Sequence, residues 1–167
     1  MSARFSTIRT LSSPEETAAL ARSIAPALQP GDTLLLEGPI GAGKTHFARA
    51  LIQARLSAAG LFEDVPSPTF TIVQTYDDGI AEIWHADLYR LTGPQEIEEI
   101  GLAEAFANAI CIVEWPDRLS GLAPTDALFL KFAPGAGESD RDLTMESASP
   151  RWKAILKSAG HLAPERT

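Results

Sequence analysis

Residues 38–45 read Gly38-Pro39-Ile40-Gly41-Ala42-Gly43-Lys44-Thr45 and come just after the apolar run Thr33-Leu34-Leu35-Leu36. Such a run, bounded by turn residues, is typical of a strand that is buried on both faces. Beyond Thr45, apolar residues recur at helical spacing from Phe47 to Leu56. The glycine-rich stretch therefore connects a strand to a helix, and this context predicts a P-loop.

The residue types in the loop suit a nucleoside triphosphate. A triphosphate concentrates several negative charges, and glycines let consecutive backbone N–H groups point at its oxygens. The following helix turns its positive end toward the same place. We expect Lys44 to reach the β and γ phosphates and the Thr45 hydroxyl to bind Mg²⁺. The residues expected to bind the nucleotide through this loop are Gly38, Pro39, Ile40, Gly41, Ala42, Gly43, Lys44, Thr45 and His46.

Two carboxylates are candidates for a second Mg²⁺ ligand, which such sites usually take from the end of a neighbouring strand. Glu114 ends the apolar run 110–113, and this strand would bring it to the edge of the sheet where ligands bind. Asp87 ends the strand Ile83-Trp84-His85-Ala86. We expect Glu114 to bind the metal, and Asp87 to lie behind the ligands or to orient the attacking water. Of the nearby side chains, Cys111 and Trp115 are expected to serve packing, and His85 is expected to be packed and hydrogen-bonded.

Strands and helices alternate along the rest of the chain. Further helices are expected over 14–28, over 94–106 with a break at Gly101, and over 150–158. Further strands are expected over 69–76 and 80–85, joined by an Asp77-Asp78-Gly79 hairpin turn, and over 109–113, 127–132 and 142–146. This order predicts an α/β fold, a three-layer P-loop NTPase-like domain with a mainly parallel sheet. We expect a single domain over 1–167, with a tail that frays from about residue 160.

Composition narrows the function classes. The chain has 167 residues, 45% of them apolar and 22% charged, which is typical of a globular protein. Its net charge is −8 and its 14 Lys and Arg are scattered, so tight binding of tRNA by the chain alone is not expected. The single cysteine, Cys111, fits a reducing compartment, and the sequence has no apolar run of membrane-spanning length. We expect a cytoplasmic protein with no membrane association.

Several segments together resemble one family, the bacterial TsaE proteins. They occur in the family's order over most of the chain: residues 38–49, Ser67-Pro68-Thr69-Phe70-Thr71, His85-Ala86-Asp87-Leu88-Tyr89-Arg90-Leu91, Glu98-Glu99-Ile100-Gly101-Leu102 and Val113-Glu114-Trp115-Pro116. Many families share the P-loop, whereas the HxDLYR and VEWP segments are much more specific. The resemblance implies an ATPase that is needed to make threonylcarbamoyl adenosine in the anticodon loop of some tRNAs.

The resemblance also implies roles for individual residues. Thr45 and Glu114 would bind Mg²⁺. Thr69 and Asp87 would belong to switch-like segments near the γ phosphate, and with Lys44 they form the expected catalytic set. Arg141 would correspond to a late arginine near the nucleotide. The family's adenine contacts come partly from the stretch that is residues 13–17 in this chain.

The leading functional expectation is therefore a slow Mg²⁺-dependent ATPase that drives its partners, proteins of the TsaB and TsaD type, and meets tRNA only through them. A small-molecule kinase is the main alternative, but it usually needs an arginine-bearing lid, and the segment after Glu114 offers Arg118 alone. A GTPase would carry an Asn-Lys-x-Asp motif, which the sequence lacks. A nucleotide sensor without turnover would have the same sequence features as the ATPase.

Overall fold

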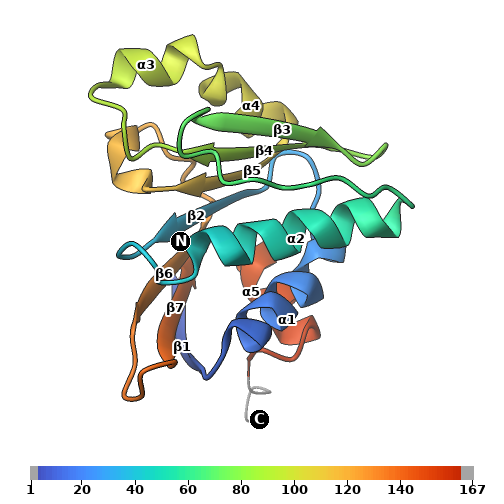
Figure 1. Ribbon diagram of the computed structural model, residues 1–167, viewed down its shortest axis with the longest axis vertical. Coiled ribbons are helices and arrows are strands. Elements are labelled where there is room, and N and C mark those ends of the chain that lie inside the picture. The colour runs from blue at the N-terminus through green and yellow to red at the C-terminus, as the bar shows by residue number, and fades with distance from the viewer. Residues whose placement is uncertain (1–3, 163–167) are drawn as a thin grey trace.

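The structure is a computed structural model that describes residues 4–162, and in this range it has a seven-stranded sheet with the order β1-β7-β6-β2-β5-β4-β3 (Figure 1). The strands are β1 (Phe5–Leu11), β2 (Thr33–Glu37), β3 (Val73–Asp77), β4 (Glu82–Asp87), β5 (Ile110–Glu114), β6 (Leu128–Pro134) and β7 (Arg141–Ser147). Helices cover both faces of this sheet. The predicted α/β class is confirmed.

The four central strands are parallel. β4 pairs with β5, β5 with β2, and β2 with β6, all in the parallel sense. In this register Glu114 lies opposite Leu36 on one side and Asp87 on the other. The carboxyl ends of parallel strands meet at one edge of a sheet, which is where ligands bind in open α/β folds. The residue that ends β2 and the two carboxylates that end β4 and β5 therefore lie along one edge.

The outer strands are antiparallel, so the sheet as a whole is mixed. β7 pairs antiparallel with both β6 and β1, and β3 pairs antiparallel with β4. The sequence analysis did not anticipate β1. Its half-buried residues Phe5, Thr7 and Arg9 alternate with exposed residues, as expected for a strand with one face on the core. This alternation of mostly polar residues gives a weak sequence signal.

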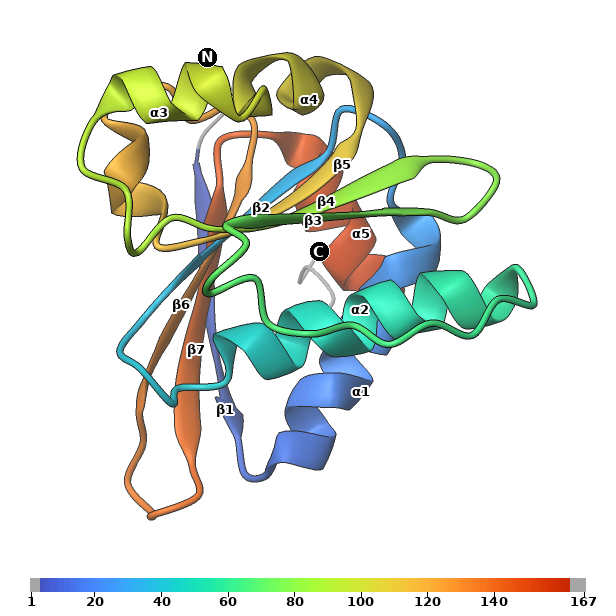
Figure 2. The same ribbon diagram turned by 45° about the horizontal axis from the view of Figure 1, so that its top comes forward.

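The helices form two layers, which Figure 2 separates clearly. The α-helices are α1 (Pro14–Ile24), α2 (Lys44–Ala58), α3 (Pro94–Glu99), α4 (Leu102–Asn108) and α5 (Pro150–Ser158), with short 3₁₀ turns η1 (Ala25–Ala27) and η2 (Pro116–Leu119). α1, α2 and α5 pack on one face, and α3 and α4 on the other. The expected break at Gly101 separates α3 from α4, where Gly101 has a φ of 79°.

The central strands are apolar on both faces because each face is covered. In β2, Leu34 and Leu36 contribute to the core beneath α1 and α2, and Leu35 contributes to the core beneath α3 and α4. Cys111 in β5 also belongs to the second core and is fully buried, which raises the pKa of its thiol to about 12. The interpretation of Cys111 as a packing residue is thus confirmed.

Several segment boundaries differ by a few residues from the sequence-based expectation: the helix expected over 14–28 ends at Ile24, and the strand expected over 80–85 is Glu82–Asp87. The strand expected from residue 69 begins only at Val73, and 66–72 form a loop. At the start of the expected tail, the imidazole of His161 contacts Ser23 and Arg9, and Leu162 packs against the core. The remainder of that expected tail, 163–167, lies outside the described residues.

Candidate active site

The P-loop connects β2 to α2 through a backbone that depends on glycine. Gly38, Gly41 and Gly43 all have positive φ angles, between 82° and 146°. A Cβ atom at Gly38 would lie 2.5 Å from the carbonyl oxygen of Phe132 in β6, so any other residue would force the loop away from the sheet. Gly43 is the N-cap of α2. The loop therefore leads directly into the N-terminus of a 15-residue helix, whose free N–H groups favour anions.

Lys44 is folded into the site. Its Nζ atom donates a hydrogen bond of 2.5 Å to Gly38 O and lies 3.5 Å from the centre of the Trp115 ring. Burial lowers the pKa of Lys44, whereas the carboxylates of Glu114 and Asp87 act in the opposite direction. Trp115 itself has a left-handed backbone, with φ at 59°, and its ring packs on Tyr89 at a centroid distance of 4.9 Å. The ring forms part of the wall around Lys44 as well as packing on the core beneath α3 and α4.

Thr45 and Glu114 meet beneath the loop. The Thr45 hydroxyl donates a 2.7 Å hydrogen bond to Oε1 of Glu114, and Oε2 of Glu114 lies 2.7 Å from Nε2 of His85. Glu114 is only 2% exposed. Helix α2 supplies the hydroxyl, β5 the carboxylate and β4 the imidazole, so three elements fix the position of this carboxylate.

Asp87 lies beside Glu114 in the β4–β5 register. Its Oδ1 accepts a 3.0 Å hydrogen bond from the N–H of Tyr89. Burial raises the pKa of Asp87, and the negative charge of Glu114 adds to this effect. The two carboxylates end adjacent strands. Asp87 holds a proton more readily than an exposed carboxylate would, because burial and the charge of Glu114 raise its pKa.

Thr69 lies in the loop 66–72, which approaches the same site. Its hydroxyl lies 2.7 Å from that of Ser67. The N–H of Asp87 donates to the carbonyl oxygen of Ile72, which connects the end of this loop to β4. Ile72 has a φ of 70°, a conformation that β-branched residues rarely adopt.

One cavity of about 430 Å³ brings these groups together. The residues that line it are Ile40, Gly41, Gly43, Lys44, Thr45, His46, Thr69, Asp87, Tyr89, Glu114 and Trp115. Gly38 and Pro39, which the sequence analysis also proposed, belong to the loop but do not line this cavity. Among the described residues, no group of three or more His, Cys, Asp and Glu side chains forms a metal site by itself.

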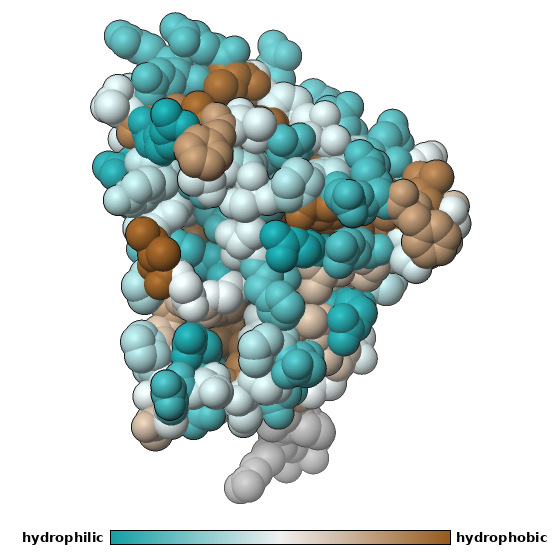
Figure 3. Space-filling model, in the orientation of Figure 1, coloured by the Kyte–Doolittle hydropathy of each residue, from teal (hydrophilic) through white to brown (hydrophobic). Residues whose placement is uncertain are grey.

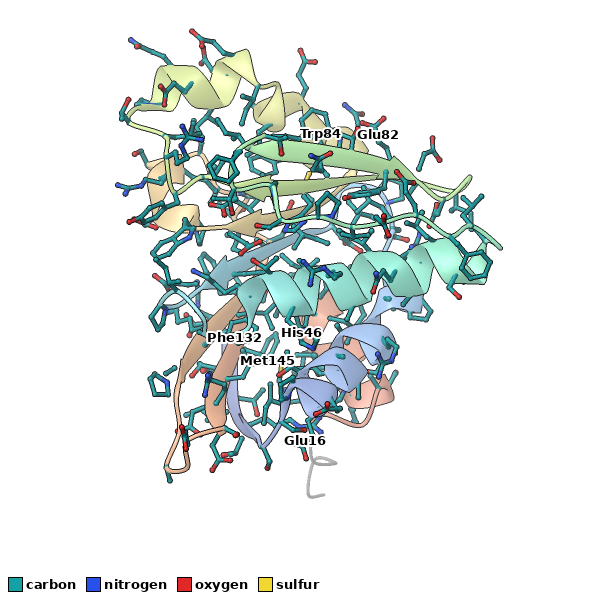
Figure 4. The ribbon with its side chains drawn as sticks, viewed as in Figure 1. Glu16, His46, Glu82, Trp84, Phe132 and Met145 are labelled. Carbon is teal, nitrogen blue, oxygen red and sulfur yellow. The ribbon has the colours of Figure 1, made fainter. Side chains whose placement is uncertain are left out.

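A second cavity, of about 350 Å³, lies on the other side of the P-loop. Its lining residues are Ser13, Pro14, Thr17, Gly41, Ala42, Gly43, His46, Glu138, Ser139 and Arg141. His46 lies on the side of α2 that faces α1, and its Nε2 lies 2.9 Å from Pro14 O (Figure 4). Arg141 contacts the loop through a 3.4 Å hydrogen bond from Nη2 to Gly41 O. The two cavities thus share the P-loop residues between them.

Comparison with known proteins identifies a family whose model matches the part of the chain that forms this site. The family model described as "Threonylcarbamoyl adenosine biosynthesis protein TsaE" matches residues 11–143, a range that includes the P-loop, Asp87, Glu114 and Arg141. The chain belongs to the TsaE family. Since the family is a threonylcarbamoyl adenosine biosynthesis family, a role in this tRNA modification pathway is supported for the chain.

Individual TsaE proteins match over most of their length. The chain is 36% identical to the tRNA threonylcarbamoyladenosine biosynthesis protein TsaE of Bacillus subtilis over 145 residues, which cover 86% of this chain and 87% of the relative. It is 41% identical to the Rickettsia bellii protein of the same name over 115 residues, 69% of this chain and 78% of the relative. The crystal structure of Bacillus subtilis YdiB superposes with a TM-score of 0.74 at 29% identity, covering 94% of this chain and 95% of that one.

The sequence analysis expected His85 to be packed and hydrogen-bonded, but it did not name the partner. His85 is fully buried, and its Nε2 lies 2.7 Å from Oε2 of Glu114. A sequence signal existed, because His85 and Asp87 are two residues apart in one strand and share a face. Tyr89 was not singled out individually, although it lines the cavity with Trp115.

In the described part of the chain, no helix is long and apolar enough to cross a bilayer.

Proposed function

We propose that the chain binds Mg²⁺-ATP at the P-loop and hydrolyses it. The observation that carries this proposal is the 2.7 Å hydrogen bond between the Thr45 hydroxyl and Glu114, directly beneath the loop and within the cavity that Lys44 and Asp87 also line. A hydroxyl at the start of the helix and a carboxylate at the end of the neighbouring strand are the pair that P-loop ATPases use. Here they come from residues 69 apart in the sequence.

The donor set fits Mg²⁺ rather than a softer metal. Thr45 and Glu114 offer a hydroxyl and a carboxylate oxygen, the hard donors that Mg²⁺ prefers. Mg²⁺ is usually held by one or two protein groups together with substrate phosphates, so the absence of a larger ligand cluster among the described residues is compatible with it. When bound, Mg²⁺ would neutralise charge on the phosphate oxygens.

The protein groups have separable tasks. The N–H groups at the start of α2 bind phosphate oxygens, and Lys44 leaves Gly38 O and the Trp115 ring to contact the β and γ phosphates. Asp87 orients the attacking water. Burial raises the pKa of Asp87, so this carboxylate accepts a proton more readily than an exposed one does. Thr69 contacts the γ phosphate from the loop 66–72.

The second cavity is the proposed site for the nucleoside. It lies across the P-loop from the phosphate cavity and is formed by 13–17, His46 and the segment that ends at Arg141. Arg141 donates to two carbonyl oxygens of its own loop and to Gly41 O, which holds its guanidinium next to the phosphate-binding backbone. We therefore propose Arg141 as a nucleotide contact.

Hydrolysis serves partner proteins of the TsaB and TsaD type in this proposal. Large apolar side chains are exposed near the phosphate cavity: Ile40 is 79% exposed and Phe70 is 84% exposed. Apolar side chains also stand out on the largely hydrophilic face in Figure 3. Ile40 belongs to the P-loop and Phe70 follows Thr69, so a partner bound there would sense whether the γ phosphate is present. tRNA is reached through the partners, because a chain with a charge of −8 has little means of neutralising many phosphates.

Phosphate release with and without the TsaB–TsaD pair tests the proposal. We expect slow turnover by the isolated chain and a large rise with the pair, because a missing positive charge at the γ phosphate is worth roughly 10³–10⁵ in rate. Lys44→Ala supplies the blank, and Lys157→Ala, an exposed lysine on α5, is the matched control. Fast turnover by the chain alone, unchanged by the pair, would contradict partner-driven hydrolysis. Phosphate transfer to a small molecule would favour a kinase.

A further inference from the structure

His85 makes a single hydrogen bond through its side chain, and that bond goes to Glu114. The imidazole lies in β4 opposite Ile112 and is fully buried. Its Nε2 is 2.7 Å from Oε2 of Glu114, whereas its Nδ1 has no hydrogen-bond partner in the structure. A histidine that served packing alone would be expected to satisfy both nitrogens, because an unpaired buried polar atom is costly. His85 leaves Nδ1 unpaired in the core, while its Nε2 holds one oxygen of the Glu114 carboxylate.

The geometry also fixes which nitrogen carries the proton. A carboxylate only accepts hydrogen bonds, so Nε2 must be the donor. Because Nδ1 has no hydrogen-bond partner, Nε2 is the ring atom through which the imidazole holds its neighbour. Since β4 and β5 are paired on both sides within the sheet, neither backbone can shift easily to let the contact relax.

The two oxygens of Glu114 are therefore unequal. Oε2 is occupied by His85 on the interior side, and Oε1 accepts from the Thr45 hydroxyl on the side of the phosphate cavity. Glu114 lines the phosphate cavity but is only 2% exposed, so little of its carboxylate is open to water that could exchange these contacts. The carboxylate is presented to a cation through one oxygen.

This asymmetry bears on which cation is preferred. Mg²⁺ requires a small octahedral shell at about 2.0–2.1 Å, in which one oxygen per carboxylate fits well. Ca²⁺ accepts six to eight oxygens at about 2.3–2.6 Å and often takes both oxygens of one carboxylate. We propose that His85 is a positioning residue that holds Glu114 in one-oxygen ligation and thereby favours Mg²⁺ over Ca²⁺. This inference rests on the proposed Mg²⁺-ATP function.

The test compares nucleotide affinity as a function of Mg²⁺ and of Ca²⁺, measured by calorimetry with ATP. The quantity of interest is the ratio of the two half-saturating metal concentrations. His85→Leu removes the donor. His85→Gln and His85→Asn form a matched pair, because the amide of glutamine reaches as far as Nε2 and that of asparagine does not. Ile83→Val, two residues earlier on the same face and equally buried, controls for a general loosening of β4.

We expect the ratio to move toward Ca²⁺ by about tenfold in His85→Leu and His85→Asn, since partners behind a metal ligand typically affect metal affinity about 10–100-fold. His85→Gln and Ile83→Val should keep the ratio of the unmodified chain. Equal ratios in all variants would overturn the inference while leaving the proposed function intact, and so would equal weakening of both metals. If the unmodified chain bound ATP without any dependence on metal, the proposed function would fail as well. His85→Asn and His85→Gln decide the matter if His85→Leu does not fold.

A second readout needs no metal. The ¹⁵N shifts of the imidazole in the nucleotide-free protein report the tautomer, and His85→Gln identifies the resonances among the three histidines. The proposal requires a proton on Nε2. An Nε2 atom without a proton would overturn it, because it could then not donate to Glu114.

Discussion

The ammonium group of Lys44 lies 3.5 Å from the centre of the Trp115 ring and donates to Gly38 O, so the P-loop lysine occupies contacts that a phosphate would replace. A cation above an indole ring is a favourable contact, strongest when it is shielded from water. In the proposed function, binding of a triphosphate draws Lys44 away from this position. The structure holds this cation inside the protein rather than in solvent.

Tryptophan fluorescence should report this movement. We expect the emission to change when ATP binds, because the charge above the Trp115 ring leaves it. The chain has three tryptophans, and Trp115→Phe removes the one at the site while keeping an aromatic face. The change should be absent in Trp115→Phe. An equal change in that variant would mean that the signal arises from Trp84 or Trp152.

Removal of the lysine charge should weaken nucleotide binding. In Lys44→Ala the phosphates lose a charge-assisted contact of roughly 1.5–3 kcal/mol, so the affinity for ATP should fall about ten- to hundredfold. Calorimetry measures this directly, and Lys157→Ala should bind as the unmodified chain does. An unchanged affinity in Lys44→Ala would remove the assignment of Lys44 as a phosphate ligand.

Substitutions of Glu114 and Asp87 should affect different steps, Mg²⁺-ATP binding and hydrolysis respectively. Glu114→Ala should raise the Mg²⁺ concentration needed for tight ATP binding, since a metal ligand acts on the bound ground state. Asp87→Asn should bind Mg²⁺-ATP nearly as well but hydrolyse it more slowly, because a group that orients water acts mainly in the transition state. Titration of Mg²⁺ and single-turnover rates distinguish the two. If Asp87→Asn needed the higher Mg²⁺ concentration for tight ATP binding, Asp87 would be the metal ligand and Glu114 the residue that orients water.

The raised pKa of Asp87 predicts an effect on stability. The folded protein favours the protonated form of this carboxyl relative to the ordinary value of 3.8, because it is buried and lies near Glu114. Ionisation of Asp87 therefore costs stability at pH values above its folded pKa and costs nothing well below 3.8. Asp87→Asn should raise the thermal midpoint of the nucleotide-free protein at neutral pH, with the gain vanishing as the pH falls through this window. A loss of stability at pH 7 would contradict the inferred penalty.

A buried ion pair away from the site should matter more for folding than an exposed one. Arg55 and Asp78 form a 2.8 Å pair with side chains only 8% and 3% exposed. Arg55→Ala leaves Asp78 uncompensated and should cost about 3–5 kcal/mol in the free energy of unfolding. Lys131→Ala breaks a 2.9 Å pair with Glu146 at a lysine that is 46% exposed and should cost less than about 1 kcal/mol. Urea denaturation measures both, and similar costs would show that Arg55 is not compensating a buried charge.

The central part of the fold could be predicted from the sequence because its signals are local. The P-loop, the helix after it, the hairpin turn expected at 77–79 and the break at Gly101 each depend on residues a few positions apart. The structure has all of them, with the hairpin turn displaced to 78–81. Residues 110–113 were assigned to a buried strand for the same reason. The expectation that Asp87 and Glu114 end neighbouring strands follows from these assignments.

The edges and the contacts behind the site could not be predicted in this way. β1 pairs with β7, a partner more than 100 residues away, and only the folded sheet brings them together. The contact of Arg141 with Gly41 depends on the path of the loop 135–140, which local pattern does not determine. His85 presents a related difficulty. Its spacing from Asp87 places it on the same strand face, but its contact with Glu114 depends on the pairing of β4 with β5.

Ile72 introduces backbone strain into the loop 66–72. A β-branched residue with φ at 70° is strained by about 1–3 kcal/mol, and here its N–H donates to Pro68 O while its carbonyl oxygen accepts from Asp87. The hydrogen bond from the N–H of Asp87, at the end of β4, helps to hold Ile72 in this strained conformation. A rearrangement that relaxed Ile72 would recover this energy and so offset part of the cost of moving the segment that carries Thr69 and Phe70.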